Sequence, residues 1–353
     1  LFIEWDNNLD AETIGSSVGG HFPDPAYSFP LTKIYNSDFN RVLEELKKKH
    51  IILNYFVHGN PTTAGFGLSL NETESERNKI YTTNDEFIKF AFENGSAALL
   101  VDAKACGSWI VWEPNKSFCC WPQAMTGSGV WLYMDPSGGY EYQQNLQKKF
   151  SSGEITGKSL LEVPRGELYV HGDITAHLPK NGTTELSCEW ADKQGIPCVC
   201  SPPEEKNKLA VIIKQNGIYD NQALINSINN FIESVELDTG ISGSLHKFGG
   251  SSFEELDSFT ENLYNNSNVA YMILIGNDLP IFESDGLQLK GTQELGTVNS
   301  IIENGLGCYN VAISYILPPL HNPQNCKKGE TNCVEGQLYK CSDDNWVLTG
   351  ESC

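Results

Sequence analysis

Two apolar runs of strand length, each followed by a chemically reactive residue, constrain this chain more than any other feature. Residues 51–57 read IILNYFV and lead into His58, and residues 97–101 read AALLV and precede Cys106. Between them, residues 84–93 show helical periodicity after a capping Asn or Asp. This order predicts a strand–helix–strand crossover in a parallel sheet. Both reactive residues then fall at the carboxyl edge, where ligands bind in such sheets.

A cysteine beside a histidine at such an edge is suited to nucleophilic catalysis. A thiol attacks as the thiolate, which a nearby imidazole stabilises before it protonates the leaving amine. We therefore expect Cys106 to be the nucleophile and His58 the acid–base residue, with no cofactor and no metal. The amides of Gly59 and Cys106 are suited to hold the oxyanion, because glycine lets backbone approach a substrate closely. The alternative is that Cys106 is simply a small hydrophobe at a strand end.

These two motifs resemble those of the caspase-like cysteine peptidases, and most closely those of the gingipain family. In that family a strand ending in inY-x-x-HG is followed by a helix and then by aAC-x-G, as NYFVHG and KACGS follow one another here. The resemblance implies an α/β fold with a mainly parallel sheet flanked by helices. It also implies endopeptidase activity toward peptides or proteins.

Further segments of both halves extend the resemblance. In the first half, HGDITAHLP at 171–179 looks like the GDP segment that follows the Cys in the family. In the second half, LAVII at 209–213 and YMILIGND at 271–278 are similar to the LAVIV and YVLLVGD strands of the family. In the family this half precedes the His/Cys half, whereas here it follows, which implies a circularly permuted order. His171 is the rival of His58 because it too precedes a glycine. Its strand, ELYV, is shorter and more polar, so we expect His58 to act.

The same patterns predict the organisation of the chain. We expect residues 1–178 to form the half with the His/Cys pair, 179–208 a Cys- and Pro-rich strap, 209–320 a second α/β half and 321–353 a disulfide-rich tail. The two halves should pack into one body, because strands that are apolar on both faces are buried on both faces. Further strands are predicted at 1–5, 130–134, 167–170, 269–276 and 308–316, and helices at 38–49, 140–150, 221–235, 253–264 and 294–303.

Cysteines and glycosylation sequons indicate a secreted glycoprotein, and a start at Leu1 fits a removed signal peptide. The cysteine count of 11 is odd, so one thiol is left over, and Cys106 is the expected one. Zinc is a poor alternative because Cys-x9-Cys-x-Cys lacks zinc-site spacing. The cysteines expected in disulfides are Cys119, Cys120, Cys188, Cys198, Cys200, Cys308, Cys326, Cys333, Cys341 and Cys353. The sequons start at Asn71, Asn94, Asn115, Asn181 and Asn265.

The charge balance and the hydropathy exclude two classes of partner. The formal net charge is −21, which disfavours nucleic acid and anionic membrane surfaces. No apolar run approaches the eighteen or so residues that a membrane-spanning helix needs. We therefore expect neither nucleic-acid binding nor a membrane span.

Aromatic residues offer candidate binding surfaces at two places. Trp109, Trp112 and Trp121 follow Cys106 and either floor a substrate pocket or pack a disulfide-pinned loop. The tail from residue 326 is too short for a core of its own, so disulfides must hold it. It resembles small fungal chitin-binding modules, which implies that Tyr339 and Trp346 stack on the sugar rings of a cell-wall polysaccharide. The alternatives are a structural staple or a contact for self-association.

Three classes of function follow from these observations. The leading one is a secreted cysteine endopeptidase that uses Cys106 and His58. The second is a non-catalytic, glycosylated wall or filament protein with a peptidase-derived fold, because a fold alone does not fix activity. The third is a carbohydrate-binding protein that acts through its tail. The state of the Cys106 sulfur discriminates best, since a disulfide there would favour the structural class.

Overall fold

A computed structural model shows how these segments are arranged. The residues that it describes are 2–4, 33–35, 39–56, 59–60, 63–65, 81–83, 93–104, 130–134, 145–146, 148–164, 168–180, 186, 195, 197–201, 205–282, 295–296, 302–303, 306–317, 331–334, 337–342 and 345–352.

The His/Cys half forms one arm of a large sheet. Its strands are β1 (Phe2–Glu4), β2 (Lys33–Tyr35), β3 (His50–Phe56), β7 (Ala98–Lys104), β8 (Val130–Met134) and β9 (Leu168–His171), with helix α2 (Phe39–Leu46) before β3. The two apolar runs that dominate the sequence are therefore strands, as predicted, and they are parallel neighbours. Of the helix predicted at 84–93, only residue 93 lies in the part of the chain that the structure describes, and it is helical.

The second half forms the other arm. Its elements are β10 (Lys208–Lys214), α9 (Gln222–Thr239), β11 (Gly243–Phe248), α10 (Phe253–Ser267), β12 (Val269–Ile275) and β15 (Ala312–Ile316). Local sequence sets the helix ends: Asn221 accepts the amide of Leu224 at the start of α9, and Ser252 and Glu255 form a capping box at the start of α10. All seven residues of β12 are buried, as expected of a strand covered on both faces.

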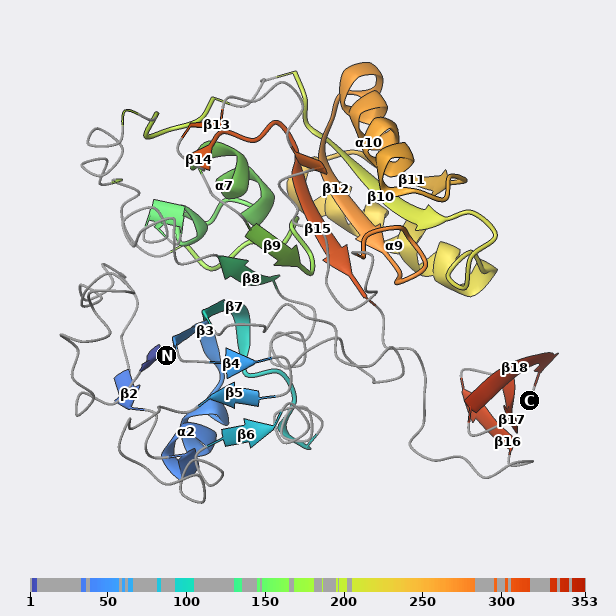
Figure 1. The fold of residues 1–353 in the computed structure, drawn as a ribbon, viewed down its shortest axis with the longest axis horizontal. Helices are drawn as coiled ribbons and strands as arrows, with labels where there is room; N and C mark the ends of the chain where they lie inside the picture. The colour runs from blue at the N-terminus through green and yellow to red at the C-terminus, as the bar shows by residue number, and fades with distance from the viewer. Residues whose placement is uncertain are drawn as a thin grey trace.

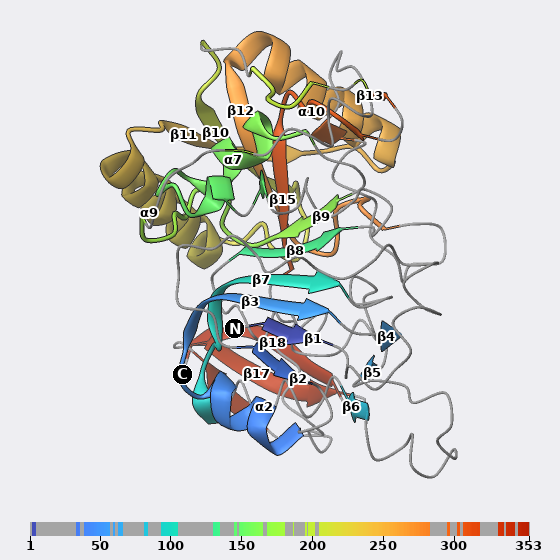
Figure 2. The same cartoon turned by 90° about the vertical axis from the view of Figure 1, so that its left-hand side faces the viewer.

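The two arms join in a single ten-stranded sheet, in the order β11-β10-β12-β15-β9-β8-β7-β3-β1-β2 (Figure 1). Figure 2 shows the lower strands of this sheet, β9, β8, β7, β3 and β1, stacked one below another. Neighbouring strands are parallel except for β8 and β9, which are antiparallel. The strand direction therefore reverses within the first arm: β2, β1, β3, β7 and β8 run one way, whereas β9 runs the other way, together with β15, β12, β10 and β11. This confirms a mainly parallel α/β fold in which the halves share one body.

Contacts at the seam show how tightly the arms are joined. Tyr315 of β15 is paired with His171 of β9, and its carbonyl oxygen accepts the amide of Gly172 at 2.9 Å. The Ser314 hydroxyl donates to the Gly172 carbonyl oxygen at 2.8 Å. Buried side chains from both arms, among them Leu100 and Val211, belong to one continuous apolar cluster. The hydrophobic core thus crosses the boundary between the halves.

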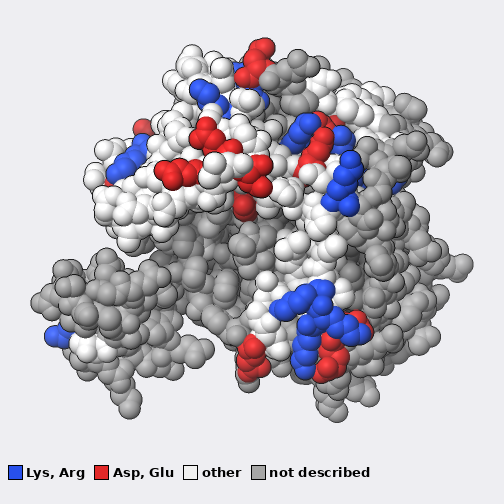
Figure 3. Space-filling model, turned by 180° about the vertical axis from the view of Figure 1, so that it is seen from behind, with Lys and Arg blue, Asp and Glu red and all other residues white. Residues whose placement is uncertain are grey.

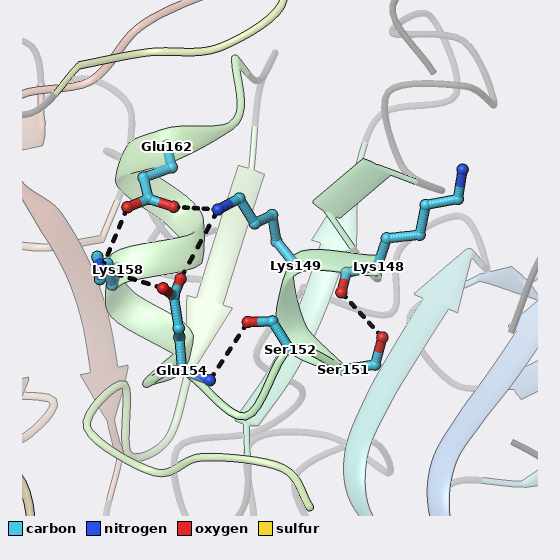
Figure 4. A network of polar contacts seen from close by, with 7 residues as sticks. All are labelled: Lys148, Lys149, Ser151, Ser152, Glu154, Lys158 and Glu162. Atoms are coloured by element: carbon cyan, nitrogen blue, oxygen red, sulfur yellow. Dashed lines mark hydrogen bonds and ion pairs between the residues drawn. The ribbon is translucent and has the colours of Figure 1, made fainter. Parts of the chain in front are cut away.

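Helix α7 (Thr156–Glu162) also bridges the arms, because it precedes β9 in the chain but packs against the second arm. Its Gly157 lies so close to β12 that an added Cβ would come within 2.8 Å of the Tyr271 ring and 3.0 Å of the Ile174 carbonyl oxygen. An ion-pair network also holds α7 to the preceding segment (Figure 4). Lys149 lies 2.5 Å from Glu162, and Lys158 bridges Glu154 and Glu162 at 3.0 and 3.5 Å.

We expect Gly157→Ala to lower the free energy of unfolding by about 1–3 kcal/mol, because overpacking a tight contact between rigid groups costs that much. Urea denaturation of the full chain checks this. Gly249→Ala is the matched control: a Cβ there would meet only the end of the flexible Gln215 side chain, at 2.9 Å. Equal stability of the two variants would show that the helix–strand contact is looser than this geometry indicates.

Smaller sheets account for segments that the sequence patterns missed or misassigned. The helix predicted at 294–303 is wrong at its end, because Ile302–Glu303 is strand β13 and pairs with β14 (Leu306–Gly307). The short strands β4 (Gly59–Asn60), β5 (Thr63–Gly65) and β6 (Tyr81–Thr83) form an antiparallel sheet after β3. In the tail, β16 (Thr331–Val334), β17 (Gln337–Ser342) and β18 (Asn345–Ser352) form another, drawn apart from the large sheet in Figure 1.

Candidate functional site

The candidate site is defined by the ends of β3 and β7. The register of the two strands is regular near their ends, from Leu53 opposite Val101 to Phe56 opposite Lys104. His58 and Cys106 both lie outside the described residues, and each follows the last paired residue of its strand by two positions. The two strands therefore stop at the same level and in the same direction. Gly59, the expected oxyanion donor, is the first residue of β4.

His171, the rival histidine, belongs to a different part of the sheet. It pairs with Trp131 near the start of β8, and Trp131 in turn pairs with Val101 in the middle of β7. It therefore lies level with Val101, about 10 Å before the end of β7 at roughly 3.3 Å per residue. Because β9 runs against β8, the carboxyl end of β9 also faces the opposite edge of the sheet.

The surroundings of His171 are those of a core residue. The residue is 2 % exposed, and its ring meets the Tyr315 ring edge-on at 5.8 Å between centroids. Burial lowers the pKa of this imidazole to about 3, because the charged form loses its hydration. A ring that stays neutral and excluded from solvent is poorly suited to shuttle protons. This supports the choice of His58 over His171.

Sequence reasoning passed over one charged residue in these strands. Asp102 of β7 is 1 % exposed, and every other residue of the strand before Lys104 is apolar. Its partners in the ladder are Asn54 of β3 and Leu132 of β8. Asp102 lies about 7 Å before the end of β7 at roughly 3.3 Å per residue. It is therefore part of the strand and does not reach the edge where β3 and β7 end. The signal was present in the sequence as a single Asp within an apolar run.

Two acidic motifs, Gly172-Asp173 after β9 and Gly276-Asn277-Asp278 after β12, lie at the edge of the sheet opposite to the ends of β3 and β7. Asp173 accepts the Thr175 amide at 2.8 Å, and Asp278 accepts the Ile218 amide at 2.8 Å. Burial raises the pKa of both carboxyl groups, because desolvation disfavours the charged form. Asp173 thus stabilises the turn in which it lies, and Asp278 stabilises the loop between β10 and α9.

The cysteines whose sulfur atoms the structure describes are disulfide-bonded, as expected. Cys200 and Cys308 are joined with an S–S distance of 2.05 Å, and Cys198 is also disulfide-bonded. Cys200 lies in the strap, and its amide donates to the Glu162 carbonyl oxygen of α7 at 2.8 Å. The strap is thereby tied to both arms. Within the described ranges, no group of His, Cys, Asp or Glu side chains is arranged to hold a metal ion.

The remaining expected site residues are only partly placed. Trp109, Trp112 and Trp121 lie outside the described residues, as do Asn71, Asn115 and Asn181. Asn265 is exposed on α10 and Asn94 is half-buried at a helix end, so glycosylation of these two stays a prediction. In the tail, Tyr339 of β17 is opposite Leu348, and Trp346 of β18 is opposite Cys341. Sugar binding there also stays a prediction.

The described surface shows no basic stripe on the face seen in Figure 3, where acidic and basic side chains are intermixed. Local ion pairs in the described residues join Lys47 with Glu44 at 2.7 Å and Lys247 with Asp220 at 2.5 Å. None of the helices in the described ranges has the length and apolar character needed to cross a bilayer.

Comparisons with protein-family models, curated proteins and solved structures find no match for this chain.

Proposed function

We propose that this chain is a secreted cysteine endopeptidase with a caspase-like, gingipain-like fold, whose nucleophile is Cys106 and whose acid–base residue is His58. The observation that carries the proposal is the register of β3 and β7. These parallel neighbours end on the paired residues Phe56 and Lys104, two positions before the histidine and the cysteine. Nucleophile and base must lie within hydrogen-bond reach, and strands that end level favour that geometry.

The proposed mechanism uses only groups of this chain and a peptide substrate. The Cys106 thiolate attacks the scissile carbonyl carbon, and the resulting oxyanion receives hydrogen bonds from the amides of Cys106 and Gly59. The His58 imidazolium protonates the leaving amine as the C–N bond breaks. Water, deprotonated by His58, then hydrolyses the thioester and restores the thiol. The carboxyl edge of a parallel sheet supports this assignment, because substrates bind at that edge in open α/β sheets.

Selective alkylation tests the proposal. Iodoacetamide applied to the native, unreduced protein should label Cys106 alone, as read by peptide mass spectrometry. Cys106→Ala and His58→Ala should each lower the rate of hydrolysis of a fluorescent casein substrate by about 10³-fold or more, as loss of a nucleophile or its base does in other peptidases. His177→Gln serves as the control because His177 is exposed and its partner is the exposed Asp238 at 3.5 Å.

Two results would overturn the assignment. Cys106 found in a disulfide would remove the nucleophile and favour the non-catalytic wall or filament protein. Casein hydrolysis that persists in Cys106→Ala, while His177→Gln also retains it, would place the activity elsewhere in the chain.

A further inference from the structure

Strand β11 is the last strand of the large sheet, and its outer edge meets no other strand in the part of the chain that the structure describes. Among the described strands it pairs only with β10, and its six residues stay in continuous register from Gly243 to Phe248. At the two ends of this pairing, the carbonyl oxygens of Ser242 and Phe248 accept the amides of Leu209 and Gln215 at 3.0 and 2.8 Å. Because residues of a parallel strand alternate between its two neighbours, the backbone groups of Gly243, Leu245 and Lys247 point away from β10.

A helix packs against each face of β11, although Ser244 and Lys247 stay exposed. On one face, an added Cβ at Gly243 would lie 3.0 Å from Ile232 of α9. On the other, the rings of His246 and Phe248 contact Phe259 of α10 at centroid distances of 6.5 and 5.6 Å. Each face thus has a helix against it, and no described strand pairs with the edge between them.

Natural sheet edges are usually guarded by a proline, a bulge or a free charge, and β11 has none of these. Its sequence GSLHKF contains no proline, and its register with β10 has no bulge. Its single lysine, Lys247, is drawn into an ion pair with Asp220 at 2.5 Å. An edge whose outward N–H and C=O groups pair with no strand among the described residues can act as a template for another strand.

We propose that β11 is a self-association surface, on which a second copy of this chain adds its own β11 in antiparallel, two-fold fashion. The register that uses every outward-facing residue places Leu245 opposite its copy and Gly243 opposite Lys247. No like charges then face each other, because each Lys247 lies opposite a glycine and keeps Asp220 as its partner. Ser244 and His246, which bond within the strand at 2.8 Å, also lie opposite one another across the pair.

Sedimentation velocity on the full chain tests this surface. We expect a reversible dimer whose share rises with salt, because screening weakens the repulsion between two chains of net charge −21. Leu245→Pro should shift the protein to monomer, because it removes an outward amide that makes no bond to β10. Its melting temperature should fall as well, because the Leu245 side chain packs against the core, so the folded fraction is checked by circular dichroism before sedimentation. A monomer at the highest soluble concentration and high salt would overturn the proposal. Filaments would also overturn it, because they require β11 to bind a different surface of the next copy.

A cysteine scan gives a second readout that does not depend on how well the proline variant folds. In the two-fold register the two Leu245 Cα atoms lie about 5.5 Å apart, within disulfide range. Leu245→Cys should therefore give a covalent dimer on a non-reducing gel. Leu237→Cys, at a site on α9 that is 89 % exposed, is the matched control and should not. Equal cross-linking of both variants, or of neither, would contradict a two-fold β11 interface.

Discussion

Residues 1–200 expressed alone will aggregate or fold incompletely, although they contain every residue of the proposed catalytic site. Truncation at that point removes β15 from the side of β9, so the pairing of His171 with Tyr315 is lost. It also removes Tyr271, against which Gly157 of α7 packs. The apolar cluster is cut through, and each newly exposed large side chain costs about 1.5–3 kcal/mol. A few such losses exceed the 5–15 kcal/mol by which a typical domain is stable.

Thermal unfolding and size-exclusion chromatography of the fragment check this prediction. The matched control is the full chain with a protease site inserted between residues 201 and 205, cut after folding. Because the Cys200–Cys308 disulfide and the shared core both hold the halves together, the cut protein should stay in one piece without reductant. A soluble 1–200 fragment that melts cooperatively as a monomer would show two independent domains instead.

The sequence predicted the strands best where they are apolar along their whole length. The strands β3, β7, β8, β10 and β12 follow from largely apolar runs, and β10 and β12 are the clearest cases because nearly all of their residues are buried. By contrast, β11 was missed: GSLHKF lies at an edge, where burial does not dictate composition. The end of the predicted 294–303 helix failed because two residues of it pair as β13 with β14, and a tertiary pairing overrides local propensity.

The arrangement of the strands is harder to foresee than their positions. Nothing in the sequences of β8 and β9 signals that this one pair is antiparallel, yet that reversal turns His171 away from the candidate site. Likewise, the sequence was enough to assign the two reactive motifs to strand ends. It did not reveal the register, which makes β3 and β7 stop at the same level. Register is set by packing across the whole sheet, so it depends on residues far from either motif.

Acid will destabilise the folded protein largely through His171. Burial lowers the pKa of this imidazole from 6.5 to about 3 in the folded state, while in the unfolded chain it keeps its ordinary value. Between those values the unfolded state binds the extra proton, so stability is lost as the pH falls from about 6.5 toward 3. At about 1.4 kcal/mol per pKa unit, the full shift corresponds to at most about 5 kcal/mol.

Urea denaturation between pH 7 and pH 4 measures this loss. Two carboxyl groups work in the opposite direction, because burial raises the pKa of Asp173 and Asp278 and so favours the protonated folded form as the pH falls. A variant must therefore isolate the histidine.

The His171→Asn side chain cannot titrate in this range, so the free energy of unfolding should fall less steeply with falling pH in that variant than in the native chain. His50→Asn is the matched control, because His50 is only half-buried and the hydrogen bond from its Nε2 to the Glu45 carbonyl oxygen partly offsets the lowering of its pKa. If His171→Asn and the native chain lost stability in parallel, the acid sensitivity would belong to other groups, and the buried ring at the seam would be a packing element only.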